Sequence, residues 1–150
     1  MIKVLYVCVA NMCRSPALMA ALNHLAAEKG VEVHADSCGI GWVYLGQRPN
    51  LKSFEAAKKK GILIDHKSKP FEDSFFDEYD YIFTVDDEIS EQLRLRNPKY
   101  SHKIHLATAF SSKFKDQPIS DPYYMSASGF DEVTDIILDA CEGFLKSIQT

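Results

Sequence analysis

The alternation of strand-like and helix-like segments limits the folds open to this chain. Short runs rich in apolar and β-branched residues lie at 2–7, 31–38, 80–85 and 103–106, and helical patterns lie at 16–29, 51–60, 87–96 and from Gly129 onward. A chain that alternates in this way favours parallel strands joined by helical crossovers. We therefore expect an α/β fold, a three-layer sandwich with a four-stranded parallel sheet flanked by helices.

Length and charge narrow the classes of protein further. The 150 residues fit one domain, since domains usually have roughly 100–200 residues. The 17 basic and 21 acidic residues give a net charge of −4, which disfavours nucleic acid and anionic lipid as partners. The N-terminal apolar run is too short for a membrane span and lacks the order of a signal peptide. We expect a single domain over 1–150, no membrane association and a cytoplasmic location.

The cysteines show no metal-binding pattern. Cys8, Cys13, Cys38 and Cys141 form no C-x-x-C pair and have no histidine at zinc spacing. In a reducing cytosol such residues are expected to be thiols. No metal site is predicted.

The segment from Cys8 to Pro16 lies where the first strand meets the first helix. Ligands bind at such junctions in open α/β sheets. A loop over residues 9–15 can turn several backbone N–H groups inward, and the helix dipole adds positive potential. Arg14 adds a planar fork of donors that can hold two oxygens of one anion. The sequence therefore predicts a phosphate-binding loop after the first strand.

Cys8 opens this loop, and the donors that would hold an anion would also stabilise its thiolate. The hydroxyl of Ser15 is a further candidate donor to the sulfur. A buried structural cysteine is the alternative, but it leaves Arg14 unexplained at a helix start, where the dipole disfavours a cation. An anion bound in the loop accounts for both residues.

These residues resemble the low-molecular-weight protein tyrosine phosphatases. That family's signature is similar to C-x-G-N-x-C-R-S-P, which this chain matches at Cys8, Asn11, Cys13, Arg14, Ser15 and Pro16. Its late Asp-Pro-Tyr triplet is present as Asp121-Pro122-Tyr123, followed by Tyr124, and further matches are Ser37 and Gly39, His66, residues 80–83 and Asp86. Ala10 stands where relatives carry a loop glycine, which is tolerable if its φ is negative.

The resemblance implies a role for each matched residue. Cys8 would be the nucleophile that forms a phosphocysteine, Arg14 would bind phosphate, and Asp121, oriented by Pro122, would be the general acid and base. His66 would steady Asn11, and Ser37 would support the same loop. The remaining candidates for substrate binding are Val9, Ala10, Asn11, Met12, Cys13, Ser15, Trp42, Tyr44, Tyr123 and Tyr124.

The implied substrate is a phosphotyrosine-containing protein or peptide, or a small aryl phosphate. Inorganic phosphate, vanadate and sulfate should compete with it, no cofactor is needed, and the protein should be a monomer or weak dimer. Met12 favours phosphotyrosine, since relatives specific for phosphoarginine carry Thr at that position. Cys13 is either a small residue packed under the loop or a thiol that traps oxidised Cys8 as a disulfide.

Two other functions fit parts of the pattern. Arsenate reduction uses the same fold and a similar loop, but it needs further cysteines on a mobile segment, and residues 66–100 contain none. A non-catalytic phosphate-binding module would keep Arg14 and the loop, but it would have no reason to keep both Cys8 and Asp121. The sequence therefore favours the phosphatase.

Overall fold

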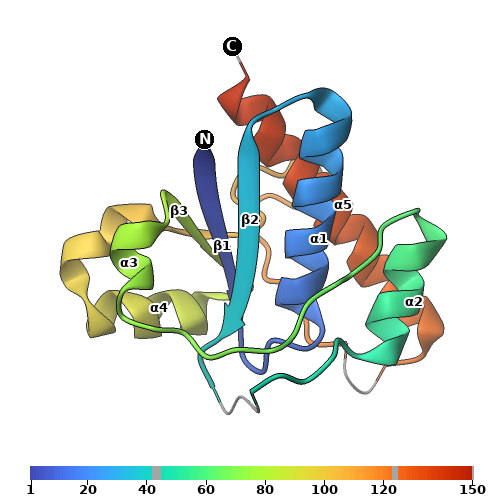
Figure 1. Ribbon diagram of the computed structural model, residues 1–150, viewed down its shortest axis with the longest axis horizontal. Coiled ribbons are helices and arrows are strands. Elements are labelled where there is room, and N and C mark those ends of the chain that lie inside the picture. Colours follow the sequence, from blue (N-terminus) through green and yellow to red (C-terminus); the bar gives the residue numbers. More distant parts are fainter. Residues whose placement is uncertain (42–44, 123–124, 150) are drawn as a thin grey trace.

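A single parallel sheet forms the centre of the computed structural model, which describes residues 1–41, 45–122 and 125–149. Its four strands lie in the order β2-β1-β3-β4 (Figure 1). They are β1 (Ile2–Cys8), β2 (Val33–Gly39), β3 (Tyr81–Thr84) and β4 (Ile104–Leu106). Every neighbouring pair is parallel. The predicted four-stranded parallel sheet is confirmed.

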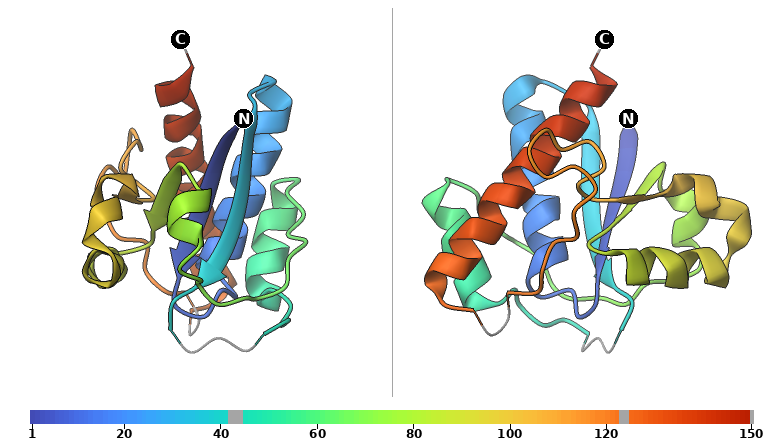
Figure 2. Two further views of the ribbon diagram at one scale, coloured as in Figure 1. Left: turned by 60° about the vertical axis from the view of Figure 1, so that its left-hand side comes forward. Right: turned by 180° about the vertical axis from the view of Figure 1, so that it is seen from behind.

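Helices cover both faces of this sheet. They are α1 (Arg14–Lys29), α2 (Leu51–Lys59), α3 (Phe75–Glu78), α4 (Asp87–Arg96), the 3-10 helix η1 (Pro98–Lys103) and α5 (Ala127–Ile148). The two views of Figure 2 place α1, α2 and α5 on one side of the sheet and α3 and α4 on the other. The predicted three-layer sandwich is therefore confirmed.

Several element boundaries differ from the prediction. The first helix begins at Arg14, two residues before the predicted start at Pro16. The last begins at Ala127, two residues before the predicted start at Gly129. Strand β2 begins at Val33 because Gly30, with φ of 65°, ends α1 in a left-handed cap that binds Val31 N back to the helix. Helices α3 and η1 were not predicted, since they are too short to show periodicity.

The core packs around the central strand. Residues Val4 to Cys8 of β1 are all buried, as expected for a parallel strand covered on both faces. The ring of Tyr6 stacks on Phe83 at 5.4 Å between centroids, and Phe144 of α5 meets Phe83 edge-on at 5.0 Å. Burying each large apolar side chain is worth about 1.5–3 kcal/mol, so these rings stabilise the pairing of β1 with β3 and the packing of α5 on the sheet.

Helix α5 lies so close to the chain at Phe110 that Gly143 has no room for a side chain. A Cβ there would overlap the carbonyl oxygen of Phe110. We expect Gly143→Ala to lower the free energy of unfolding by about 1–3 kcal/mol, because this overlap outweighs the better helix propensity of alanine. Urea unfolding followed by circular dichroism measures the change. Glu142→Ala, at an exposed position of the same helix, should stay within about 0.5 kcal/mol of wild type.

Candidate active site

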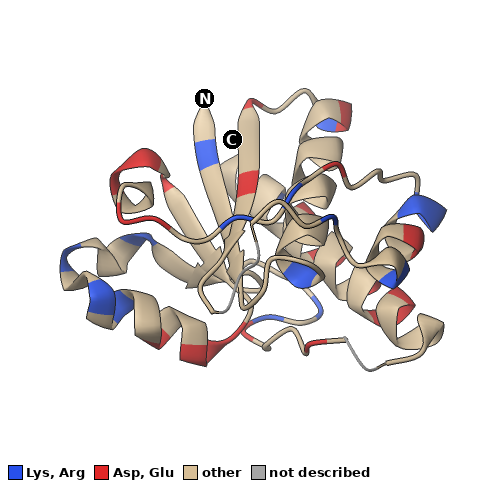
Figure 3. Cartoon of the chain, turned by 60° about the horizontal axis from the view of Figure 1, so that its bottom comes forward, with Lys and Arg blue, Asp and Glu red and all other residues tan. Residues whose placement is uncertain are grey.

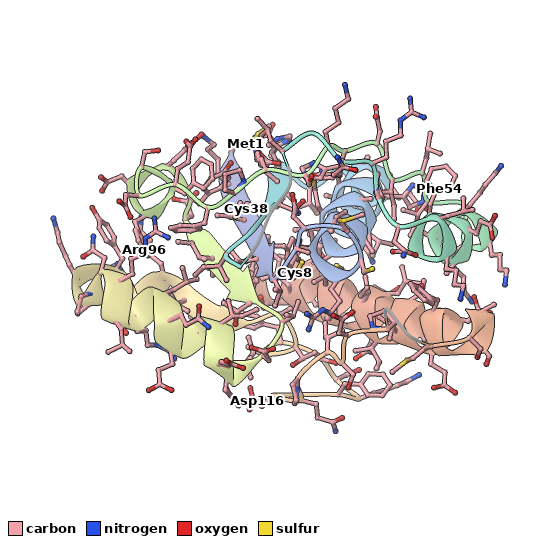
Figure 4. All side chains as sticks on the ribbon, turned by 90° about the horizontal axis from the view of Figure 1, so that it is seen from below. Met1, Cys8, Cys38, Phe54, Arg96 and Asp116 are labelled. Carbon is pink, nitrogen blue, oxygen red and sulfur yellow. The ribbon has the colours of Figure 1, made fainter. Side chains whose placement is uncertain are left out.

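The site lies at the carboxyl ends of β1 and β3. The chain leaves β1 toward β2 on one side, and β3 pairs on the other side, so the crevice between these strand ends is a topological switch point. Cys8 ends β1, and Asp86 follows β3 by two residues. Figure 4 looks onto this edge of the sheet, with Cys8 near its middle.

Asn11 organises the loop between β1 and α1. Its backbone is left-handed, with φ of 59°, a conformation that costs roughly 1 kcal/mol or more outside glycine. Its Oδ1 accepts from His66 Nε2 at 2.8 Å and from Lys69 N at 3.0 Å. Its Nδ2 donates to Ser15 Oγ at 2.8 Å and to Ser37 Oγ at 3.0 Å. An amide side chain has capacity for four such bonds, so Asn11 is fully satisfied.

The bonds of Asn11 fix the protonation of His66. One atom of the Asn11 amide contacts both Lys69 N and His66 Nε2. Because Lys69 N can only donate, this atom is the carbonyl oxygen, and His66 Nε2 must carry the proton of the second bond. Burial lowers the pKa of His66 below its ordinary value of 6.5, with Lys69 acting in the same direction and Asp36 opposing. The ring is therefore a neutral donor at neutral pH.

An ion pair braces the same loop from outside. Lys69 Nζ contacts the carboxylate of Asp36, which also accepts from Tyr79 OH at 3.1 Å and from Ser37 N at 2.8 Å. Burial opposes the charge of Asp36, but Lys69 and these donors hold its pKa below 3.8. The two residues that touch Asn11 from this side, Ser37 and Lys69, are thus tied together by Asp36.

The substitution of alanine for the usual loop glycine is accommodated. The left-handed conformation falls on Asn11, and Ala10 is not among the residues with positive φ. A close approach occurs instead at Gly41, where a Cβ would lie 2.6 Å from Val9 Cγ1 and would displace that side chain. Gly41 N donates to Val9 O at 2.9 Å, so this close approach supports the start of the loop.

The sulfur of Cys8 makes two hydrogen bonds. Asn11 N donates to it at 3.3 Å, and Ser15 Oγ lies 2.9 Å away. Ser15 Oγ already accepts from Asn11 Nδ2, so its single proton points to Cys8 Sγ or to Cys38 O, which is farther away at 3.3 Å. A thiolate at Cys8 would take that proton as a charge-assisted bond. The predicted contact between Ser15 and Cys8 is confirmed.

Arg14 is held beside this sulfur although it is only 5% exposed. Its Nη1 donates to Ile119 O at 3.0 Å and lies 3.9 Å from Asp86 Oδ2. Its Nη2 lies 3.8 Å from Asp121 Oδ2. Both carboxylates are beyond ordinary hydrogen-bond length, so they balance the charge while leaving donors available to an anion.

Asp86 was matched in the sequence, but its position beside Arg14 was missed. Its Oδ1 caps α4 by accepting from Ile89 N at 2.9 Å, which points Oδ2 back toward Arg14. A signal was available, because an aspartate just after a strand and before a helix is a typical N-cap at the ligand-binding edge of a parallel sheet.

The start of α1 provides further donors. Within the described residues, the backbone N–H groups of Met12, Cys13, Arg14 and Ser15 have no hydrogen-bond partner, and the first turn holds no acidic residue. Together with the helix dipole they form a site for an anion. A hollow of about 60 Å³ lies in front of them and is lined by Cys8, Ala10, Met12, Cys13, Arg14 and Asp121.

Cys13 differs chemically from Cys8. It is buried and packs in a small cluster with Ala56 and Phe130. Burial raises its pKa to about 12, so it is a neutral thiol at physiological pH. All four cysteines are free. Cys141 on α5 is buried, as the apolar stripe of that helix predicted, and its sulfur contacts Tyr6 of β1.

The structure brings most of the predicted site residues to one edge of the sheet. The candidates that surround or support the hollow are Cys8, Ala10, Asn11, Met12, Cys13, Arg14, Ser15, Ser37, His66 and Asp121. Pro122 is buried next to Asp121, whose side chain is 55% exposed, and Val9 is exposed at the loop start. Trp42, Tyr44, Tyr123 and Tyr124 lie outside the described residues.

Asn50 and Lys69 were missed as contributors. Asn50 caps α2 with its side chain, and its backbone N–H donates to Met12 O at 2.8 Å. Lys69 contributes through its backbone, which any residue except proline could supply. No residue-type signal marks such backbone contacts in a sequence.

The described residues form neither a metal-ligand cluster nor a membrane-spanning helix. In residues 1–41, 45–122 and 125–149, no three His, Cys, Asp or Glu side chains are grouped in a way that could hold a metal ion. None of the helices in this part of the chain has the length and apolar character needed to cross a bilayer.

The buried His66 generates a test of the site. We expect a pKa below 6.5 in an NMR titration of its ring, with His66→Gln used to assign the resonances. Since folding favours the neutral ring, its contribution to stability is present above pH 6.5 and is lost as the pH falls through the lower native pKa. A native pKa above 6.5 would contradict the neutral ring, since the charged ring could donate from Nε2 as well.

Comparison with known proteins gives one consistent result. The family model described as low molecular weight phosphotyrosine protein phosphatase matches residues 3–150. YfkJ of Bacillus subtilis, named a low molecular weight protein-tyrosine-phosphatase, is 36% identical, with 99% of this chain and 97% of YfkJ covered. The low molecular weight phosphotyrosine protein phosphatase of Schizosaccharomyces pombe is 34% identical, with 98% of this chain and 97% of that protein covered.

A solved structure agrees in fold and sequence. The crystal structure of a protein tyrosine phosphatase from Entamoeba histolytica, with Hepes in its active site, superposes with a TM-score of 0.93 at 32% identity and covers 99% of this chain and 97% of its own. The fold, the loop around Cys8 and these matches over nearly the whole length lead to one conclusion: this chain belongs to the low molecular weight phosphotyrosine protein phosphatase family.

Proposed function

We propose that the protein hydrolyses phosphotyrosine monoesters in proteins or peptides, and small aryl phosphates, through a phosphocysteine on Cys8. One observation carries this proposal: a cysteine sulfur that is hydrogen-bonded to Asn11 N and Ser15 Oγ shares one hollow with a buried arginine and an aspartate. Nucleophile, anion site and acid are the three groups that cleavage of a phosphate ester needs.

In the first step, the thiolate of Cys8 attacks phosphorus, and the bond from phosphorus to the phenolic oxygen breaks. Asp121, protonated, gives its proton to the departing oxygen, so that a neutral phenol leaves. The N–H groups at the start of α1 and the fork of Arg14 hold the three equatorial oxygens, whose charge must be balanced in the transition state.

In the second step, a water molecule attacks the phosphocysteine. Asp121, now a carboxylate, takes a proton from that water, and the bond from phosphorus to sulfur breaks to release inorganic phosphate. Ser15, 2.9 Å from the sulfur, donates its hydroxyl to the departing thiolate and makes it a better leaving group. The enzyme returns to its starting state with Asp121 protonated again.

The chemistry uses only groups that the chain itself supplies, so no metal or organic cofactor takes part. Inorganic phosphate, vanadate and sulfate should compete for the same donors. Met12, which lines the hollow, supports phosphotyrosine as the substrate in preference to phosphoarginine. We propose that the protein acts as a monomer or weak dimer.

Two alternatives remain as outcomes of the tests. Arsenate reduction needs a relay of further thiols on a mobile segment, but residues 66–100 contain no cysteine and Cys141 is buried on α5. A non-catalytic phosphate-binding module would explain Arg14 and the free N–H groups, yet it leaves the bond between Ser15 and the Cys8 sulfur without a purpose.

Replacing Cys8 tests the reaction itself. We expect wild type to hydrolyse p-nitrophenyl phosphate, and Cys8→Ser to lose at least about 10³-fold in kcat, since a serine hydroxyl lacks the activated character of the thiolate. Isothermal titration with inorganic phosphate is the control, because Cys8→Ser should still bind the anion. Inactive wild type that binds phosphate would support the non-catalytic module, and thiol-dependent reduction of arsenate would support the reductase.

Replacing Asp121 tests the proton donor. We expect Asp121→Asn to lower kcat about 10²-fold or more for an aryl phosphate with a poor leaving group, such as phenyl phosphate. The loss should be smaller for p-nitrophenyl phosphate, whose leaving group needs little protonation. Asp116→Asn is the matched control, since Asp116 is exposed in the same connection and asparagine tolerates its left-handed backbone. Equal losses for both substrates would contradict the role of Asp121.

A further inference from the structure

A second and larger cavity lies between α2 and the segment that follows it. Its volume is about 500 Å³, within the range of roughly 300–1,000 Å³ typical of sites for small molecules. Figure 4 shows Phe54 on α2, well to the side of Cys8. The lining residues among those described are Arg48, Pro49, Leu51, Phe54, Leu63, Ile64, Asp65, His66 and Lys67.

The walls of this cavity are mostly apolar. Leu51 on α2 and Leu63 on the facing segment are 68% and 66% exposed, while Phe54 and the buried Ile64 lie between them. Two leucines facing one hollow leave apolar surface in water, and covering it is favourable by about 25 cal/mol per Å². An occupant with an apolar body would therefore be stabilised here.

The rim carries cations without a partner. Arg48 and Lys67 are exposed, and neither makes a hydrogen bond or ion pair with any residue in the described part of the chain. Lys59 at the end of α2 and Lys60 just after it differ, since they pair with Asp131 and Asp135. Figure 3 shows that charges of both signs are spread over the molecule.

Among the described lining residues, Asp65 carries one negative charge, Arg48 and Lys67 carry two positive charges, and His66 is neutral. The electrostatic balance of the cavity therefore favours an anion with one negative charge. We propose that this cavity binds a small amphiphilic organic anion, with an aromatic or branched apolar body and one carboxylate or sulfonate group. The apolar body would lie between Leu51 and Leu63, and the anionic group would face Arg48 and Lys67.

The cavity is also connected to the phosphate-binding loop. His66 lines it and donates to Asn11, and Asn50, between the lining residues Pro49 and Leu51, donates to Met12 O at 2.8 Å. Ser53, beside Phe54, donates to Cys13 O at 3.0 Å. An occupant that fits these walls stabilises them in the arrangement that supports the loop. We therefore include in the proposal that occupancy raises the affinity of the loop for phosphate, and this part rests on the proposed function.

The test uses 8-anilinonaphthalene-1-sulfonate, an amphiphilic aryl sulfonate whose fluorescence rises in apolar surroundings. The full-length protein is titrated in excess inorganic phosphate, which fills the loop at Cys8 and keeps the sulfonate out of it. We expect saturable binding at one site. Leu63→Asp should weaken binding about tenfold or more, and Leu95→Asp, at a leucine 75% exposed on α4, is the matched control and should leave it unchanged.

A second pair of variants tests the charge. Arg48→Gln should weaken sulfonate binding about threefold or more, whereas Lys99→Gln, at an exposed cation on η1, should not. Circular dichroism checks that each variant folds. For the coupling, phosphate is titrated at a fixed sulfonate concentration into wild type and Leu63→Asp, because competition at the loop is the same in both and only wild type keeps the cavity site. Phosphate should bind wild type about fivefold more tightly than the variant, and equally without the sulfonate.

Several results would overturn the proposal. One is the absence of saturable sulfonate binding, and another is an equal loss of sulfonate affinity in Leu95→Asp and Leu63→Asp. A third is binding of a capped acidic, leucine-containing peptide in the absence of sulfonate binding, which would mark the surface as a docking site for polypeptides. Equal phosphate affinities of wild type and Leu63→Asp in the presence of the sulfonate would contradict the coupling and leave the cavity's ligand class standing. Saturable binding to a wild type without phosphatase activity would contradict the proposed function and leave the cavity's ligand class standing.

Discussion

The site depends on the side chain of Asn11, whose hydrogen bonds offset the cost of its own left-handed backbone. Asn11 holds its left-handed conformation with four hydrogen bonds, to His66, Lys69, Ser15 and Ser37. Each bond is worth about 0.5–1.5 kcal/mol net, so together they exceed the cost of the strained backbone. The same turn aims the N–H of Asn11 at the Cys8 sulfur. Loop shape and nucleophile environment therefore have a common cause.

The sheet determines where these partners come from. Ser37 lies on β2, which pairs with β1 so that Tyr6 is opposite Ser37 and Cys8 is opposite Gly39. Gly39 N binds Lys69 O at 3.0 Å, which carries the segment of His66 and Lys69 to the end of β2. A shift of one residue in the register of β1 and β2 would turn Ser37 away from Asn11. Core packing of β1 therefore supports the catalytic geometry directly.

The sequence predicted what is local and what the family pattern carries. The four strands, the loop after the first strand and the contact between Ser15 and Cys8 follow from residues close together in the chain. The contact of His66 with Asn11, 55 positions away, was predicted only through the resemblance and is confirmed. Backbone donors of Asn50 and Lys69 were missed, because any residue type except proline can supply them.

Asp86 shows why the remainder required the fold. It is 72 positions from Arg14, and only the pairing of β1 with β3 brings the two together. The prediction from charge was likewise limited, since a net charge of −4 describes the whole molecule and not one crevice. At the start of α1, a buried guanidinium, a helix without a side-chain cap and N–H groups without a partner among the described residues combine their positive potential.

Two carboxylates on one guanidinium illustrate how position separates their roles. Asp86 is fixed by capping α4, so it can orient Arg14 but cannot move toward a substrate. Asp121 lies on a long connection, is 55% exposed and lines the hollow in front of Cys8. A group that exchanges protons with a leaving group and with water must reach both, and the position of Asp121 fits this proposed role better than that of Asp86. The geometry thus divides one ion-pair cluster into a positioning residue and the proposed acid.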